Sequence, residues 1–299
     1  MLTINNKKFI KIQFLYLTKN NPMETYTPET LDQLYEIINA NRSHGWSSFL
    51  TFFRGQIFDW PIKPNVTRNP SLSDEQILEI EKEAFSEFTS YSEGLRILEH
   101  FEKDSTKHAQ DWHNLFQAQH LGLYTRLTDW TQDDRSSMFF AVDDQKEEFL
   151  EANGVIWIYK CPYYPEDDLL INFNETDETY HFFDQNPFEL KKAYVIKHYA
   201  QFSDDVEDYA GEIRRFRQDG SFIISTSKDI SKSIEELEYV SPHLVKIFIK
   251  PSLKREIIKH LGEDIRDYIY YSSNENNSEQ TEKIGTLTAN TNQKYFWKK

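Results

Sequence analysis

Cysteine is nearly absent from this sequence, which has one among 299 residues. A lone thiol can form no intramolecular disulfide, and one chain cannot build a cysteine-based zinc cluster from it. Cysteine usage of this kind is typical of a reducing compartment, so we expect a cytoplasmic protein.

Several signatures of common function classes are also missing. No run of about 18 apolar residues is present to span a bilayer, so we expect no membrane partner. The sequence has neither GxGxxG nor GxxxxGK[ST], which argues against a dinucleotide fold of the Rossmann type and against a P-loop. Its nine histidines show no HExxH spacing, and we therefore expect no metal.

Positive charge is scarce relative to negative charge. The chain has 34 lysines and arginines against 49 acidic residues, a formal net charge of −15. Such a surface repels phosphate backbones, so contact with nucleic acid would need a local basic groove. What the chain does have is 38% hydrophobic residues and 15% aromatics, enough for the core of one globular domain.

The order of local signals predicts the organisation of that domain. Thr27 followed by Pro28 predicts a helix start, and Ser73 with Gln76 reads as a capping box at the start of a second helix. Helical patterns gather early, while short β-prone runs such as "GVIWIYKC" and "LVKIFIK" gather late. We expect an α+β fold around a mixed or antiparallel sheet. The expected divisions are an N-terminal extension at 1–26, a domain at 27–271 and a polar C-terminal tail at 272–299.

Three polar clusters lie beside apolar sequence that should be buried. They are "FFRGQ", "QAQHLGLYTRLTDWT" and "RRFRQDGSFIISTS". Arg54 ends an apolar strand with a permanently charged fork that suits phosphate or carboxylate, and Gly55 would let a ligand approach the backbone. A structural reading is also open, in which Arg54 or Arg126 pairs with Asp129 inside the protein and His120 is a core histidine.

These clusters carry a resemblance to a known family. "FFRGQ" with "DWPIKPNVTR", then "QHLGLYTRLTDWT" before "SSMFFAV", then "RRFRQDGSFIIS" and "KIFIKPSLKREIIKHL", resemble the FRG domain, a bacterial family named for its Phe/Tyr-Arg-Gly motif. The similarity covers roughly residues 45 to 271. One departure is Tyr124, where members usually have a proline, and it affects the expected local turn.

A weaker resemblance is to mono-ADP-ribosyltransferases, which begin with an aromatic-Arg-Gly strand end and carry a later Ser-Thr-Ser strand. "FFRG" matches the first element and "FIISTS" approximates the second. The resemblance implies NAD as substrate, with an ADP-ribosyltransferase-like fold. The later transferase elements can be assigned in two ways. We prefer the assignment in which "TRLTDWT" takes the place of the Ser-Thr-Ser element and "QDGSF" is the last strand of the active site. The implied catalytic residues are Arg54, Asp129 and Glu212. The implied NAD-binding residues are Arg54, Gly55, Gln56, His120, Thr125, Arg126, Thr131 and Gln218.

The leading hypothesis is transfer of ADP-ribose from NAD to an intracellular macromolecule, protein or nucleic acid. A role as a bacterial toxin or phage-defence effector, with an antitoxin or regulator as partner, extends that hypothesis. One alternative is a non-enzymatic protein-interaction module. The other is a nucleic-acid-binding protein, motivated by the basic residues Arg214, Arg215, Arg217, Lys246, Lys250, Lys254 and Arg255.

Overall fold

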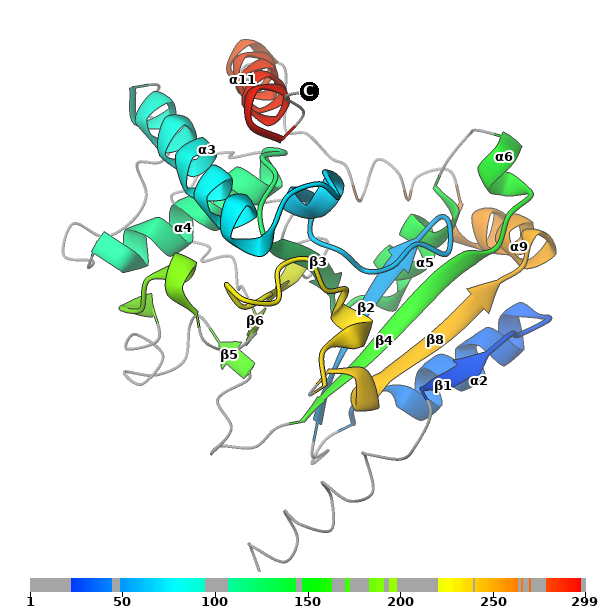
Figure 1. Ribbon diagram of the computed structural model, residues 1–299. Helices are drawn as coiled ribbons and strands as arrows, with labels where there is room; N and C mark the ends of the chain where they lie inside the picture. The colour runs from blue at the N-terminus through cyan, green and yellow to red at the C-terminus, as the bar shows by residue number, and fades with distance from the viewer. Residues whose placement is uncertain are drawn as a thin grey trace, which may run out of the picture.

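Eight strands form one mixed sheet in the part of the chain that the computed structural model describes (Figure 1). The described residues are 23–44, 49–94, 107–143, 147–162, 170–172, 183–190, 194–197, 220–238, 240–262, 265, 269 and 278–296. The strand order is β1-β8-β4-β2-β3-β7-β6-β5, with β1–β8 and β5–β6 parallel and the remaining pairs antiparallel. The predicted α+β fold with a mixed sheet is confirmed, although helices and strands are interspersed along the chain.

The elements follow the chain in this order. The strands are β1 (Glu24–Tyr26), β2 (Phe49–Gln56), β3 (Leu127–Thr131), β4 (Gly154–Pro162), β5 (Leu170–Asn172), β6 (Tyr194–Lys197), β7 (Gly220–Ile224) and β8 (Leu244–Ile249). The α-helices are α2 (Leu31–Asn41), α3 (Asp74–Gly94), α4 (Lys107–His120), α5 (Asp134–Val142), α6 (Glu147–Leu150), α9 (Pro251–Leu261) and α11 (Ser278–Phe296). Short 3-10 helices are η1 (Asn65–Arg68), η2 (Pro187–Glu189), η3 (Ile234–Glu236) and η4 (Ser241–His243).

Two groups of helices cover different parts of one sheet face. Apolar side chains of α2, α5 and α9 pack on β8, β4 and β2, for example Ile38 and Ile257 with Phe53. Those of α3, α4 and α11 pack on β3, β7 and β6, for example Phe88 and Phe116. The opposite face carries a third cluster that includes Phe52, Trp130 and Trp157, covered in part by residues of η3. The fold therefore has two helical layers that meet over the middle of the sheet.

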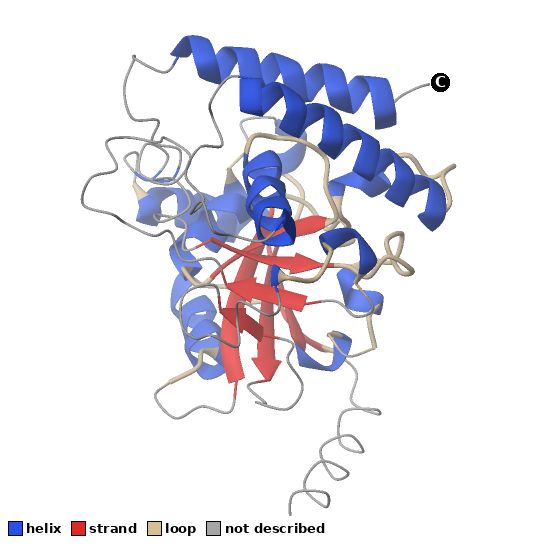
Figure 2. Cartoon of the chain, turned by 90° about the vertical axis from the view of Figure 1, so that its left-hand side faces the viewer, coloured by secondary structure: helices blue, strands red, loops and turns tan. Residues whose placement is uncertain are grey.

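The middle of the sheet is its weakest connection. β2 and β3 share a single register pair, Phe53 with Thr131, whereas β2 and β4 are paired along the whole of β2. The view in Figure 2 shows one set of strands crossing the other, as expected where a strongly twisted sheet changes direction. We call this gap in the ladder the β2–β3 seam. It divides the sheet into β1-β8-β4-β2 and β3-β7-β6-β5.

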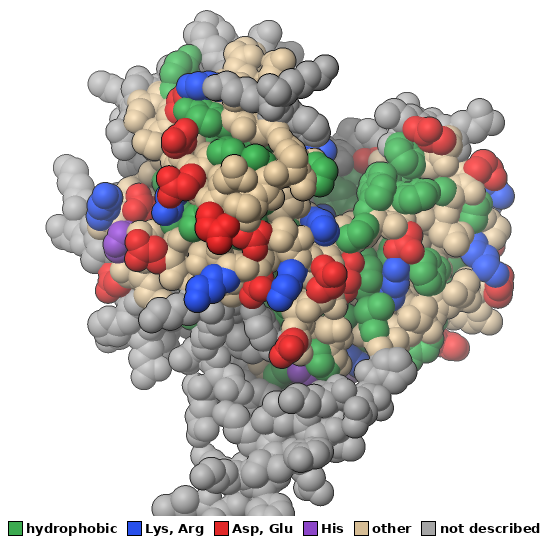
Figure 3. Space-filling model, in the orientation of Figure 1, with side chains coloured by type: hydrophobic (Ala, Val, Ile, Leu, Met, Phe, Trp, Pro, Cys, Tyr) green, Lys and Arg blue, Asp and Glu red, His purple; other side chains and the backbone are tan. Residues whose placement is uncertain are grey.

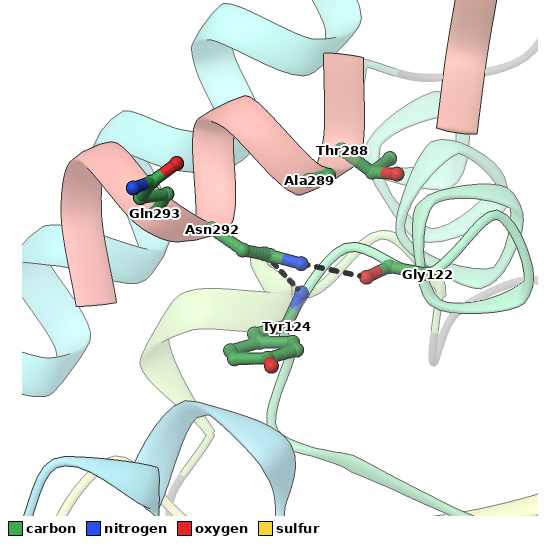
Figure 4. A pocket seen from close by; sticks show the side chains of 6 residues that line it. All are labelled: Gly122, Tyr124, Thr288, Ala289, Asn292 and Gln293. Carbon is green, nitrogen blue, oxygen red and sulfur yellow. Dashed lines mark hydrogen bonds between the residues drawn. The ribbon is translucent and has the colours of Figure 1, made fainter. Parts of the chain in front are cut away.

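Helix α11 lies within the segment expected as a polar tail, and it packs against the domain. Phe296 is fully buried in the cluster around α3 and α4, and Asn292 bonds to the loop before β3 (Figure 4). Its Nδ2 donates to the Gly122 carbonyl, and its Oδ1 accepts from the Tyr124 N–H, both at 2.9 Å. A cavity of about 510 Å³ beside these bonds is lined by Gly122, Tyr124, Thr288, Ala289, Asn292 and Gln293.

Replacing Asn292 by alanine is expected to lower the free energy of unfolding by about 1–3 kcal/mol. The change leaves the Tyr124 N–H and the Gly122 carbonyl without the amide that now bonds both, and unmet polar groups of this kind cost that amount. Urea denaturation measures the effect. Gln293→Ala, at an exposed neighbouring position, is the control and should change stability little. Equal effects of the two changes would contradict this role for Asn292.

Candidate functional site

Arg54 lies at the seam, one residue beyond the only β2–β3 register pair. Strand alternation directs its side chain to the face of Phe52, and its Nη1 donates to the carbonyl oxygen of Asp129 on β3 at 2.6 Å. Its Nε is buried and has no hydrogen-bond partner within the described structure. Burial lowers the pKa of the Arg54 guanidinium, while the charges of Asp129 and Glu235 raise it. The strand thus delivers a cation with one buried donor that has no partner in the described structure.

Asp129 connects the seam to helix α4. Its side chain is exposed, although the residue lies on a central strand, because it falls where the two helical layers meet. Gln119 Nε2 donates to both carboxylate oxygens at 3.2 and 3.0 Å, and Thr125 Oγ1 donates to Gln119 Oε1 at 2.7 Å. The resulting chain of bonds orients the carboxylate. Arg54, Thr125 and Asp129, predicted to share a site, are brought together.

A second carboxylate, that of Glu235 in η3, acts on Arg54. Both oxygens of Glu235 in η3 accept from the Ile62 N–H, at 3.2 and 3.1 Å, and its charge favours the protonated guanidinium. The neighbouring Glu236 accepts instead from the N–H and the hydroxyl of Ser233 in a capping box. No local pattern distinguishes these two glutamates.

Gly55 and Gln56 serve packing in this structure. A Cβ at Gly55 would lie 1.9 Å from the Ser137 carbonyl oxygen, so the glycine allows α5 to lie directly on β2. Gln56 Oε1 accepts from the Trp157 indole at 2.7 Å. The close approach that we expected for a ligand at Gly55 is made by a helix.

Arg126 is part of a buried ion pair. Its Nε donates to Glu81 Oε2 at 2.6 Å and its backbone N–H to Oε1 at 2.7 Å, and neither side chain is more than 1% exposed. The guanidinium also donates to the carbonyls of Pro187 and Ser225. Burial raises the pKa of Glu81, and the charge of Arg126 opposes that shift. Arg126 therefore joins α3, η2 and the end of β7.

Of the remaining predicted residues, Thr131 and His120 are described, and two others lie outside the described residues. Thr131 Oγ1 accepts from the Asp133 N–H at 2.9 Å, in the turn that leads into α5. His120 is the last residue of α4 and is partly buried. Glu212 and Gln218 lie outside the described residues. Among the residues described, no group of three or more histidines, cysteines or carboxylates is arranged to hold a metal ion.

The seam therefore holds a guanidinium, directed to the face of Phe52, that bonds the backbone of Asp129, and a carboxylate that Gln119 holds on the helical face. An arginine fork suits phosphate oxygens, and an oriented carboxylate can accept from hydroxyl groups or stabilise a developing positive charge. No helix in the described part of the chain has the length and apolar character needed to cross a bilayer.

Comparison with known proteins gives one match. The family described as the FRG domain matches residues 50–149, a range that runs from β2 to α6 and includes Arg54, Gln119 and Asp129. No curated protein and no solved structure matches the chain.

Proposed function

Since residues 50–149 of this chain form an FRG domain, we propose that the domain is an ADP-ribosyltransferase-like enzyme that uses NAD at the β2–β3 seam. The observation that carries the proposal is the hydrogen bond from Arg54, whose Nε is buried without a partner in the described structure, to the backbone carbonyl of Asp129, whose carboxylate is exposed. Both groups are contributed by the matched range, and both lie where the ladder between β2 and β3 is interrupted.

Arg54 would hold the pyrophosphate of NAD. Its guanidinium already contacts the backbone of β3, so the fork is oriented, and a phosphate would reach the buried Nε only after the groups around it move apart. The acidic groups around it keep the local charge balanced before the ligand arrives.

Asp129 would act on the nicotinamide ribose. In the transfer, the bond between ribose C1′ and the nicotinamide nitrogen breaks and nicotinamide leaves with the electron pair. An acceptor oxygen or nitrogen then bonds to C1′ and releases a proton to solvent or to a base. The carboxylate, fixed by Gln119 and through it by Thr125, accepts from ribose hydroxyls and stabilises the positive charge that develops at C1′.

Two conservative variants of the full chain test these roles. Asp129→Asn keeps an acceptor for Gln119 but removes the charge, so we expect NAD binding to persist while nicotinamide release falls by about 10²–10⁴-fold. Arg54→Lys keeps the charge but loses the fork, so we expect NAD affinity to fall roughly tenfold. Calorimetric titration with NAD and chromatography of nicotinamide measure the two effects. Arg135→Lys, at an exposed position of α5, is the matched control.

The acceptor is sought with labelled NAD in a bacterial lysate that contains protein and RNA. If a macromolecule is labelled by the wild type and not by Asp129→Asn, that macromolecule identifies the acceptor class. A growth assay would then test the toxin or defence role. If the folded wild-type protein neither binds NAD nor releases nicotinamide, and Arg54→Lys only lowers thermal stability, the seam is a structural network and the enzyme proposal is withdrawn.

A further inference from the structure

Three aromatic rings come together at the surface on the loop after β2 and on α6. They belong to Phe58, Trp60 and Phe149, and we call them the aromatic cluster. Their centroids are 5.4 to 6.4 Å apart and their planes are inclined by 44 to 75°. Trp60 is 45% exposed and Phe58 is 38% exposed. Figure 3 shows hydrophobic side chains gathered on the part of the surface where this loop and α6 lie in Figure 1.

A buried lysine fastens both segments that carry the rings. Lys254 of α9 is fully buried, and its Nζ donates to the carbonyls of Ile57 at 2.7 Å and Phe149 at 2.6 Å. Gly154 leaves room for it, since a Cβ there would lie 2.9 Å from Lys254 Cε. Burial of an ammonium is costly unless it is bonded, so the cation ties the two segments at one point. The cluster is thereby ordered before anything binds to it.

The loop itself has further internal bonds. The Trp60 N–H donates to the Phe58 carbonyl at 2.9 Å, which holds the two residues in a tight turn. Asp59, between them, pairs with Lys246 at 2.6 Å, and that ammonium lies over the Trp157 and Phe248 rings. An exposed aromatic surface built on fixed backbone loses little conformational entropy on binding, which favours recognition over chance exposure.

The charges around the cluster select the kind of partner. Exposed carboxylates flank the rings at Asp59, Glu148 and Glu151. The side chain of Asp59 is 39% exposed and that of Glu151 is 65% exposed. Among the cations beside them, Lys246 is 15% exposed and Lys254 is buried, whereas Arg255 is exposed and pairs with Glu151 at 3.3 Å. Aromatic faces bordered by carboxylates attract lysine and arginine side chains. They repel phosphate, as does the whole chain with its net charge of −15.

We propose that the aromatic cluster is a docking surface for a basic segment of a partner protein, in which an apolar anchor residue is flanked by lysine or arginine. The anchor packs on Trp60 and Phe58, and the flanking cations face Asp59, Glu148 and Glu151. The aromatic cluster does not involve the β2–β3 seam, so this proposal does not depend on whether the chain uses NAD.

Fluorescence anisotropy with two labelled peptides tests the proposal on the full chain. The peptides GKKWLKKG and GEEWLEEG share the same anchor and differ in the sign of the flanking charges. At roughly 150 mM salt we expect binding of the basic peptide only. Trp60→Ala should weaken it at least about tenfold, because exposed tryptophans dominate interfaces of this kind. Tyr91→Ala removes a ring that is also 45% exposed, on α3, and should leave affinity unchanged.

Two more measurements separate the proposed partner from other occupants. The double change Glu148→Lys and Glu151→Lys should reduce binding of the basic peptide and allow binding of the acidic one. Sedimentation of the wild-type protein and of Trp60→Ala reports whether a second copy covers the cluster, and a labelled single-stranded RNA reports a nucleic acid. The proposal is overturned by equal binding of both peptides, by no binding of the basic peptide up to about 1 mM, or by its indifference to Trp60→Ala. It is likewise overturned by dimers or RNA binding that depend on Trp60.

Discussion

Replacing Arg126 by methionine is expected to lower the free energy of unfolding by about 3–5 kcal/mol, because it leaves the carboxylate of Glu81 buried without its partner. Two backbone carbonyls, of Pro187 and Ser225, lose a donor at the same time. The loss of stability would affect α3, η2 and the end of β7, which the guanidinium joins. Urea denaturation followed by circular dichroism measures it.

The pair also predicts how the loss can be reversed in part. Glu81→Leu combined with Arg126→Met removes both buried charges, so the double variant should be more stable than Arg126→Met alone. Lys294→Ala, which breaks the surface pair with Glu87, is the control and should leave the midpoint almost unchanged. Should Arg126→Met unfold at the wild-type urea concentration, the ion pair would not hold the domain together as described.

Replacing Gly55 by alanine is expected to cost about 3 kcal/mol or more, although the change adds one methyl group. The added Cβ would lie 1.9 Å from the Ser137 carbonyl oxygen and 2.7 Å from the Ala141 N, both main-chain atoms of α5. Backbone of a packed helix cannot yield as a flexible side chain does, so the helix must shift away from β2. Thermal and urea denaturation both report the loss.

Gly285 provides the matched control for that change. It lies in α11 with nothing within 4 Å of an added Cβ, so Gly285→Ala should raise stability by about 0.5–1 kcal/mol through helix propensity. Opposite signs for the same substitution at two glycines would isolate the contact with α5. A loss at Gly55 no greater than about 0.5 kcal/mol would mean that α5 does not approach β2 as closely as described.

Local chemistry made several helix boundaries predictable. The capping box expected at Ser73 and Gln76 is present, with both bonds formed. Helix α9 has the proline and glycine typical of helix ends, since it begins at Pro251 and ends before Gly262, which has a φ of 79°. The helix expected from Thr27 instead begins at Leu31, with Thr30 as its N-cap. Two nearby threonines offer the same hydroxyl, and sequence alone favoured the one before the proline.

The site depended on contacts that no local pattern contains. The Arg54–Asp129 bond joins residues 75 positions apart, and the Arg126–Glu81 pair joins residues 45 apart. From the sequence, Arg54, Asp129 and Arg126 were assigned to one candidate NAD site, with a structural pairing left open, and the arginine at the seam could not be distinguished from the arginine in the core. That distinction follows from where α3 and α4 pack on the sheet.

Composition alone did not predict the contacts of the C-terminal segment. The residues from 278 to 296 are mostly polar, and the segment was expected as a tail. In the structure one side of this helix carries buried Thr288, Thr291, Asn292 and Phe296. Apolar contacts, the two hydrogen bonds of the Asn292 side chain and the bonds of Lys294 and Tyr295 to Glu87 hold it on the domain.

The single rung between Phe53 and Thr131 has a consequence for motion. A change in the angle between the two halves of the sheet would break few main-chain hydrogen bonds, since one register pair and the Arg54 side chain span the seam. Each half carries its own helical layer, whereas the cluster of Phe52, Trp157 and Trp130 on the opposite face spans the seam and would have to adjust to such a change. A molecule bound between Arg54 and Asp129 would fix the angle between the two halves of the sheet. The rate at which the amide protons of β3 near Asp129 exchange with deuterium would then report whether such a molecule is bound.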